Sequence, residues 1–227
     1  RLGIIGLGRG FMLTLPSLLA HPDITLFAAC SSRSDARKRF EDDFGGIAYA
    51  DYDAMLGNVD VDAVYVATPH ELHMEHTVAA LAAGKCVLLE KPMAISVEQA
   101  ETIVEASKTH GKTVIVGPSH SFDPAVGEAL QLIRTGDFGK VKIVQSTYYT
   151  NFMYRPRRPE ELDTKRGGGV IFSQGAHQFD IARMLAGGVG TSLIGQAGIW
   201  DPSRRSETAY TSLIHFMGGA VANLTYS

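Results

Sequence analysis

The sequence contains few cysteines, little net charge and no long apolar run, and each of these absences excludes a class of protein. Only Cys30 and Cys86 occur among its 227 residues, too few for a disulfide scaffold, and both lie in apolar runs. A reducing cytoplasm is therefore the expected compartment. The net charge of −3 argues against a nucleic-acid-binding surface. The apolar stretch 11–20 is broken by polar residues and a proline, so no membrane span is expected.

What remains is the composition of a globular protein, with 45% hydrophobic and 20% charged residues. Residue 1 is arginine rather than methionine, and both ends of the chain lie in strand-like runs. We therefore expect the sequence to be cut at both ends.

Short apolar runs alternate with helical segments from residue 2 to about 118. The pattern predicts strands over 2–5, 25–30, 63–67, 86–90 and 113–116, and helices over 11–19, 34–44, 71–83 and 97–110. Such βαβ units build a doubly wound parallel sheet of Rossmann type. We assign this α/β domain to residues 1–120.

After about residue 120 the regular alternation of short strands and helices ends. The remaining pattern predicts an α+β domain over residues 121–227, incomplete at its C-terminal end. Its expected elements are a helix over 124–135, a strand over 140–149, an irregular basic stretch, a second helix, and strands near 192–198, 208–216 and 220–226.

A glycine-rich turn, Gly6-Leu7-Gly8-Arg9-Gly10, follows the first strand and opens the first helix. Such a turn brings backbone N–H groups and a helix N-terminus to a pyrophosphate, so these residues and Phe11 are predicted to bind a dinucleotide. The strict G-x-G-x-x-G pattern has glycine where Phe11 stands, so the helix must pack on the strand in another way. The alternative is a tight turn without a ligand.

The second strand ends in Cys30-Ser31-Ser32-Arg33. NAD sites usually have an acidic residue here for the ribose 2′-hydroxyl, whereas hydroxyl groups and an arginine suit a 2′-phosphate. The cofactor is therefore expected to be NAD or NADP, with a slight preference for NADP. Ser31 and Ser32 alternatively serve only to cap the next helix.

Two further segments lie at the carboxyl ends of predicted strands, where open α/β sheets bind ligands: Thr68-Pro69 and Glu90-Lys91-Pro92. Lys91 is suited to stabilise negative charge that develops on a substrate oxygen, although loop lysines are more often only solvated. The histidines at 70, 73 and 76 recur every three residues, which does not keep one helix face, so no metal site is predicted. His70 or His73 is instead expected to face the cofactor.

Three glycines, Gly167 to Gly169, precede a predicted helix and are expected to let the backbone approach a ligand. On that helix Ser173, His177 and Asp180 are spaced by four and three residues and share a face. Histidine suits proton transfer near neutral pH, and Ser173 is placed to orient it. A lone helical histidine is alternatively structural.

These residues resemble the Gfo/Idh/MocA oxidoreductases, whose marks are a glycine-rich first turn, a Glu-Lys-Pro motif and a histidine-bearing helix after a glycine run. The resemblance implies that Lys91 and His177 are catalytic, that Gly6 and Gly8 form the phosphate turn, and that Lys91-Pro92 is a cis peptide. It also implies an open mixed sheet in the second domain, which forms a homodimer or homotetramer. Ser173 departs from the family pattern, which often has aspartate there.

A narrower likeness covers residues 154–164 and 173–177, which resemble family members acting as 4,5-dihydroxyphthalate dehydrogenases. Paired arginines bind carboxylates well, so Arg155, Arg157 and Arg158 are predicted to contact a dicarboxylate, together with His177 and Asp180. The alternative is a solvated loop or an oligomer contact.

The predicted function is an NAD(P)-dependent dehydrogenase that oxidises a secondary alcohol of a cyclic small molecule, such as a carboxylated dihydrodiol. A sugar or inositol dehydrogenase is the first alternative. The second is a regulator that senses a dinucleotide without catalysis.

Overall fold

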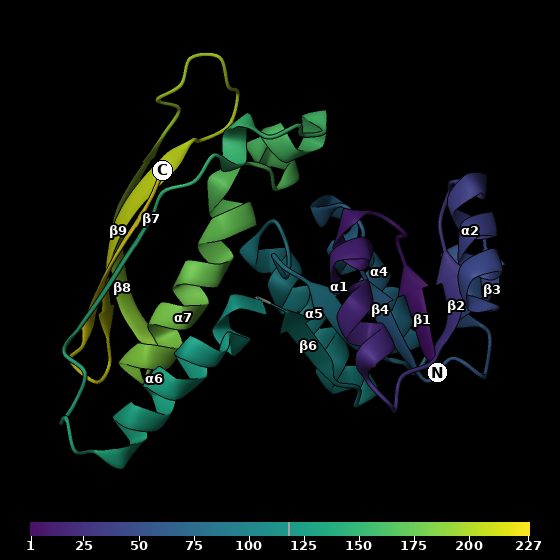
Figure 1. Ribbon diagram of the computed structural model, residues 1–227, viewed down its shortest axis with the longest axis horizontal. Coiled ribbons are helices and arrows are strands. Elements are labelled where there is room, and N and C mark those ends of the chain that lie inside the picture. The colour runs from purple at the N-terminus through teal and green to yellow at the C-terminus, as the bar shows by residue number, and fades with distance from the viewer. Residues whose placement is uncertain (118) are drawn as a thin grey trace. The chain divides into compact units, whose positions relative to one another are not determined.

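The computed structural model describes residues 1–117 and 119–227. Its contacts divide the chain into two compact units, Arg1–Gly117 and Pro118–Ser227 (Figure 1).

The first unit is a doubly wound parallel sheet, as predicted. Its strands run in the order β3-β2-β1-β4-β5-β6, and all neighbouring pairs are parallel. The strands are β1 (Leu2–Ile5), β2 (Leu26–Cys30), β3 (Ile47–Tyr49), β4 (Ala63–Val66), β5 (Cys86–Glu90) and β6 (Val114–Gly117). The helices are α1 (Arg9–Ala20), α2 (Ser34–Phe44), α3 (Tyr52–Leu56), α4 (His73–Ala82) and α5 (Val97–His110), with a 3-10 turn η1 (His70–Leu72) before α4.

Two apolar cores cover the two faces of this sheet. Successive side chains of a strand point to opposite faces, so Ile4 of β1 packs in one core and Ile5 in the other. The Ile4 core includes Phe11 and Leu18 from α1, whereas the Ile5 core includes Ile103 from α5. Because both faces are buried, the side chains and turns at the strand ends are the parts of the sheet that can meet a ligand.

The second unit carries a mixed sheet, which confirms the α+β prediction. Its strands are β7 (Ile143–Tyr148), β8 (Gly190–Gly198), β9 (Ala209–Phe216) and β10 (Val221–Tyr226), in the order β7-β10-β9-β8. Strand β10 pairs parallel with β7 and antiparallel with β9, and β9 pairs antiparallel with β8. The helices are α6 (Pro124–Thr135) and α7 (Ala176–Ala186), and a short turn, η2 (Ser119–Phe122), precedes α6. Between β7 and α7 lie the short turns η3 (Phe152–Tyr154), η4 (Pro159–Leu162) and η5 (Thr164–Arg166) and one π-helical turn, η6 (Ile171–Gly175).

Helix α7 lies against one face of the mixed sheet (Figure 1). Strand β9 alternates buried and exposed residues, so Tyr210, Ile214 and Phe216 join the core beneath the helix. Gln178 fastens the helix to the sheet, because its amide nitrogen donates to Ser146 Oγ at 2.8 Å and its amide oxygen accepts from the Tyr210 hydroxyl. The position of α7 is therefore set by polar bonds as well as by apolar packing.

Both cysteines are free thiols, in agreement with the exclusion of a disulfide scaffold. Among the helices formed by the described residues, none has the length and apolarity required to cross a bilayer.

Candidate functional site

The glycine turn after β1 is held tightly against the end of β4. Gly6 has φ +101°, and a Cβ atom on it would lie 2.7 Å from the carbonyl oxygen of Ala67. Its backbone N–H donates to Cys30 O at 2.9 Å, which ties the turn to β2 as well. The strand order reverses between β1 and β4, and this reversal is the place where doubly wound sheets bind nucleotides.

The departure at Phe11 has a simple physical reason. A Cβ on Gly10 would make ordinary van der Waals contact with Ala67 Cβ and Glu90 Cγ, each at 3.5 Å, so α1 lies close to the strand ends at this position. Phe11 fills the core, where it is 3% exposed, and a glycine there would leave that space empty.

Gly8 has the opposite environment, since a Cβ added to it would meet no atom of the described chain within 4 Å. It stands at the N-cap of α1 and has no side chain, so the space beside the helix N-terminus is open at this position. This is the space that a pyrophosphate requires, and the turn therefore fits a dinucleotide. Gly6, Gly8, Arg9 and Gly10 are the residues that would hold it.

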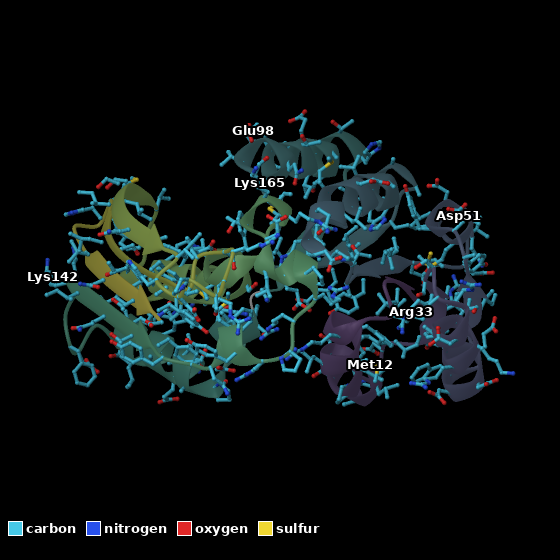
Figure 2. All side chains as sticks on the ribbon, turned by 90° about the horizontal axis from the view of Figure 1, so that it is seen from above. Met12, Arg33, Asp51, Glu98, Lys142 and Lys165 are labelled. Carbon is cyan, nitrogen blue, oxygen red and sulfur yellow. The ribbon has the colours of Figure 1, made fainter. Side chains whose placement is uncertain are left out.

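Two arginines shape the end of β2. Arg33 Nη2 donates to Leu7 O at 3.0 Å, which draws the side chain to the glycine turn, and Arg37 Nη1 donates to Ser31 O at 2.7 Å. Arg33 is labelled in Figure 2 in the same unit as Met12 of α1. The Ser31 hydroxyl accepts from the Arg33 N–H at 3.3 Å, so it also stabilises the turn before α2.

A buried tyrosine holds the glutamate of the Glu-Lys-Pro motif. Tyr65, which is 1% exposed, donates from its hydroxyl to Glu90 Oε1 at 2.6 Å. Burial and the nearby Glu90 carboxylate raise the pKa of the Tyr65 phenol, so it remains a donor. The other oxygen of Glu90 accepts from the Lys91 backbone N–H at 3.2 Å. The Lys91-Pro92 peptide bond is cis, as the family resemblance implied.

The prediction that His73 faces the cofactor needs correction. The residue has no exposed surface, and its ring lies between two carbonyl oxygens, Pro92 O at 2.7 Å from Nδ1 and Thr68 O at 3.0 Å from Nε2. Burial lowers the pKa of the His73 imidazole. His73 therefore joins the turn after β4 to the turn after β5. At the same edge of the sheet, Thr68, Pro69 and Lys91 are half-buried. Among the described side chains, no group of three potential metal ligands was found.

Helix α7, in the second unit, carries another group of predicted site residues. His177 and Ser173 are 7% and 5% exposed. Ser173 lies in the π-helical turn η6, directly before the α-helical segment that carries His177. A π turn has a wider spacing than the α-helical repeat on which the shared face was predicted, and such turns are frequent at functional sites. Asp180 forms an ion pair with Arg183 at 3.0 Å.

Two glycines of the triplet serve the chain's own packing. A Cβ on Gly168 would lie 2.6 Å from Glu160 O, and one on Gly169, where φ is +86°, would lie 2.2 Å from Glu207 Oε1. Glu207 is 6% exposed and accepts from the Thr164 hydroxyl at 2.5 Å and from the Ile171 N–H at 3.2 Å. The buried carboxylate thus fixes the entry to η6 and α7.

The basic segment divides into buried and exposed arginines. The Arg157 guanidinium lies 3.7 Å from the centre of the Phe152 ring and 3.2 Å from Glu161 Oε1, and its side chain is 4% exposed. The prediction that Arg157 binds a substrate carboxylate is therefore corrected: it fastens the segment internally. Arg155 and Arg158 are exposed, and each has one acceptor nearby, Asn151 Oδ1 at 2.9 Å and Glu161 Oε2 at 3.5 Å respectively.

Several residues that build the site were missed from the sequence. Tyr65 and Glu207 are polar residues that approach their partners only in the fold, and no local pattern marks them. Gln178 does carry a signal, since it is an uncharged polar residue next to the predicted catalytic histidine on a helix that must face a core.

Comparison with known proteins assigns both units. Residues 1–118 match the family model described as an oxidoreductase family with an NAD-binding Rossmann fold, and residues 126–227 match the GFO/IDH/MocA C-terminal domain. The chain therefore belongs to the Gfo/Idh/MocA family, which confirms the resemblance seen in the sequence, and its first unit is an NAD-binding Rossmann fold.

Individual relatives agree with this assignment. The chain is 44% identical over 228 residues to the 1-carboxy-3-chloro-3,4-dihydroxycyclohexa-1,5-diene dehydrogenase of Comamonas testosteroni, covering 100% of the chain and 57% of that protein. A crystal structure of a protein from Bordetella bronchiseptica RB50, described as a dehydrogenase, is 38% identical with a TM-score of 0.95, over 100% of this chain and 60% of that one. The WlbA dehydrogenase of Chromobacterium violaceum, solved with NADH and UDP-GlcNAcA, shares the fold at 23% identity and a TM-score of 0.90, over 100% and 66% of the two chains. The chain thus spans less than two thirds of these relatives.

Proposed function

We propose that this protein is a nicotinamide-dependent dehydrogenase that oxidises a secondary alcohol of a cyclic, carboxylated dihydrodiol. The proposal rests on two features that occur in one chain. One is the glycine turn at the reversal of strand order between β1 and β4, which fits a dinucleotide. The other is the buried His177, on a helix that is held in place by Glu207 and Gln178. The 44% identity to a dehydrogenase of a carboxylated dihydroxycyclohexadiene supports this substrate class.

In this proposal His177 is the general base and Lys91 the oxygen-binding group. A bound nicotinamide cofactor would supply the acceptor for the hydride of the carbinol carbon. His177 removes the hydroxyl proton, because a neutral imidazole is the side chain best matched to proton transfer near pH 7. The Lys91 ammonium is suited to stabilise negative charge that develops on a substrate oxygen. Glu90, held by Tyr65, accepts from the Lys91 backbone N–H and so helps to fix the turn. Ser173 keeps the role predicted for it, orienting His177.

The exposed arginines supply the substrate specificity. Arg155 and Arg158 have guanidinium groups at the surface of the second unit, and such groups bind carboxylates through two parallel hydrogen bonds. Asp180 is the further polar residue of α7 that we assign to the substrate site. Oxidation of a cyclic dihydrodiol gives a ketone that tautomerises to an aromatic ring, which drives the reaction forward.

We assign the cofactor preference to NADP. The support is Arg33, an exposed cation drawn to the glycine turn by its bond to Leu7 O, in a position where an acidic residue would repel a 2′-phosphate. The matched control is Arg39, an exposed cation farther along α2. Arg33→Ala is expected to weaken NADP binding about tenfold relative to NAD, whereas Arg39→Ala leaves the ratio unchanged. An unchanged ratio in Arg33→Ala would overturn the preference.

The function is tested with the full-length protein, either NAD or NADP, and a panel of carboxylated dihydrodiols, sugars and inositols. Absorbance of the reduced nicotinamide is expected to rise with the dihydrodiols, and Arg158→Ala is expected to raise KM for them while kcat is kept. A rise confined to sugars or inositols would favour the family's other substrate class. Nucleotide binding without turnover across the panel would favour a dinucleotide-sensing regulator.

The remaining assignments are a cytoplasmic location, which the two free thiols support, and a homo-oligomer formed through the mixed sheet. Light scattering of the full-length protein tests the second assignment directly, since a monomer at micromolar concentration would contradict it.

A further inference from the structure

A second histidine lies against His177. His120, in the turn η2, stacks on the ring of His177 with their centroids 4.0 Å apart and their planes 17° from parallel. Both residues belong to the second unit. Sequence reasoning did not single out His120.

The backbone that carries His120 is tied to the start of helix α6. The carbonyl oxygen of His120 accepts from the Asp123 N–H at 3.2 Å, and the carbonyl oxygen of Asp123 accepts from the N–H groups of Val126 and Gly127 in the first turns of that helix. Neighbouring Ser121 is 4% exposed. The His120 ring is thus anchored by a turn and a helix start rather than carried on a free loop.

This stacking restricts the catalytic ring. The terminal torsion of a histidine has broad energy wells, so an imidazole without a neighbour samples a range of ring planes. A flat partner 4.0 Å away permits only planes close to its own and keeps water from that face of the ring. Proton transfer requires the base to lie within hydrogen-bond reach of the proton, and an error of about 1 Å costs up to about 10²-fold in rate.

We propose that His120 is a positioning residue that holds the plane of the His177 imidazole for proton abstraction. The proposal rests on the proposed function of His177 as the general base. It assigns the role to the flat face of His120 rather than to its nitrogen atoms, so another flat ring should replace it.

The test compares His120→Ala and His120→Phe with the matched control His21→Ala, which removes an exposed histidine from the first unit. In the full-length protein, His120→Ala is expected to lower kcat about 10- to 100-fold while the dinucleotide Kd is kept. His120→Phe is expected to restore kcat to within about threefold of the wild type, and His21→Ala to match it. Thermal unfolding checks that each variant is folded.

Two kinetic outcomes would overturn the proposal. One is a wild-type kcat in His120→Ala when His177→Ala has lost activity. The other is an equal fall in kcat in the alanine and phenylalanine variants, which would show that the flat face of the His120 ring does not position His177.

A readout independent of turnover separates this proposal from the proposed function. Ring protons of His177 should shift in the proton NMR spectrum when the His120 ring is removed, because the ring current of the stacked partner is lost. If the wild type turns over no substrate of the panel, the proposed function fails, and this shift still tests the stack. An unchanged His177 signal in His120→Ala would overturn the placement itself.

Discussion

The two glycines of the first turn should respond to alanine in opposite ways. In Gly6→Ala the new residue must adopt φ near +101°, which costs an L-residue about 1–2 kcal/mol. Its Cβ would also lie 2.7 Å from the backbone oxygen of Ala67, and relief of such overpacking costs about 1–3 kcal/mol. The expected loss in the free energy of unfolding is therefore about 2–5 kcal/mol, a large part of the stability of a typical domain.

Gly8→Ala is the matched substitution two residues away. Gly8 has φ −100°, which any residue adopts, and its added Cβ meets no described atom within 4 Å. The free energy of unfolding should fall by at most about 1 kcal/mol, the difference between glycine and alanine at a helix N-cap, which is less than the loss expected at Gly6. Dinucleotide affinity should fall about tenfold or more, because the methyl group enters the space assigned to the pyrophosphate.

Urea unfolding followed by circular dichroism and fluorescence titration with reduced nicotinamide cofactor measure the two effects separately. The reasoning predicts a crossed result, with stability lost at Gly6 and binding lost at Gly8. Full nucleotide affinity in Gly8→Ala, or wild-type stability in Gly6→Ala, would refute it.

Three further substitutions test the framework around the site. Because burial lowers the pKa of His73 below 6.5 in the folded chain, the unfolded chain binds more protons below that pH. The free energy of unfolding should fall on acidification from pH 7.5 to 5.5, by at most about 1.4 kcal/mol per pH unit from this residue, and an equal slope in His73→Asn would contradict the linkage. Gln178→Ala should destabilise the protein by about 1–3 kcal/mol, measured by urea unfolding against the exposed control Gln196→Ala, which should change it by less than about 0.5 kcal/mol. Gly169→Ala should lower the free energy of unfolding by at least about 2 kcal/mol. If the same substitution costs less in a Glu207→Ala background, the clash is with the Glu207 carboxylate.

The fold was predictable where the hydrophobic pattern extends over a full strand or helix. The helix over 97–110 was placed correctly because Ser96 accepts from the Gln99 N–H at its start and Gly111 adopts a left-handed conformation at its end. Strand β3 and helix α3 were missed, since three and five residues are too short to show a period. The parallel sheet follows from the alternation of strands and helices, and the glycine turn at the end of β1 could be located from sequence.

The site was predictable at the level of residue type but not of side-chain partner. The histidine at 177 and the glycines at 167–169 were singled out from the sequence, yet Gly169 makes room for Glu207, which lies almost 40 residues later and has no local mark. His73 was misassigned because its spacing on a helix says nothing about the two carbonyl oxygens that enclose it. Such pairings form between elements that are distant in the chain, and local sequence patterns do not show which elements meet in space.

The central claim is that His177 removes a proton while the nicotinamide receives a hydride. It is tested most directly by the turnover of His177→Ala, measured as absorbance of the reduced cofactor with the preferred dihydrodiol, beside the dinucleotide Kd. The account predicts a fall in kcat of about 10² to 10⁴ with an unchanged Kd. Wild-type turnover in this variant would contradict it.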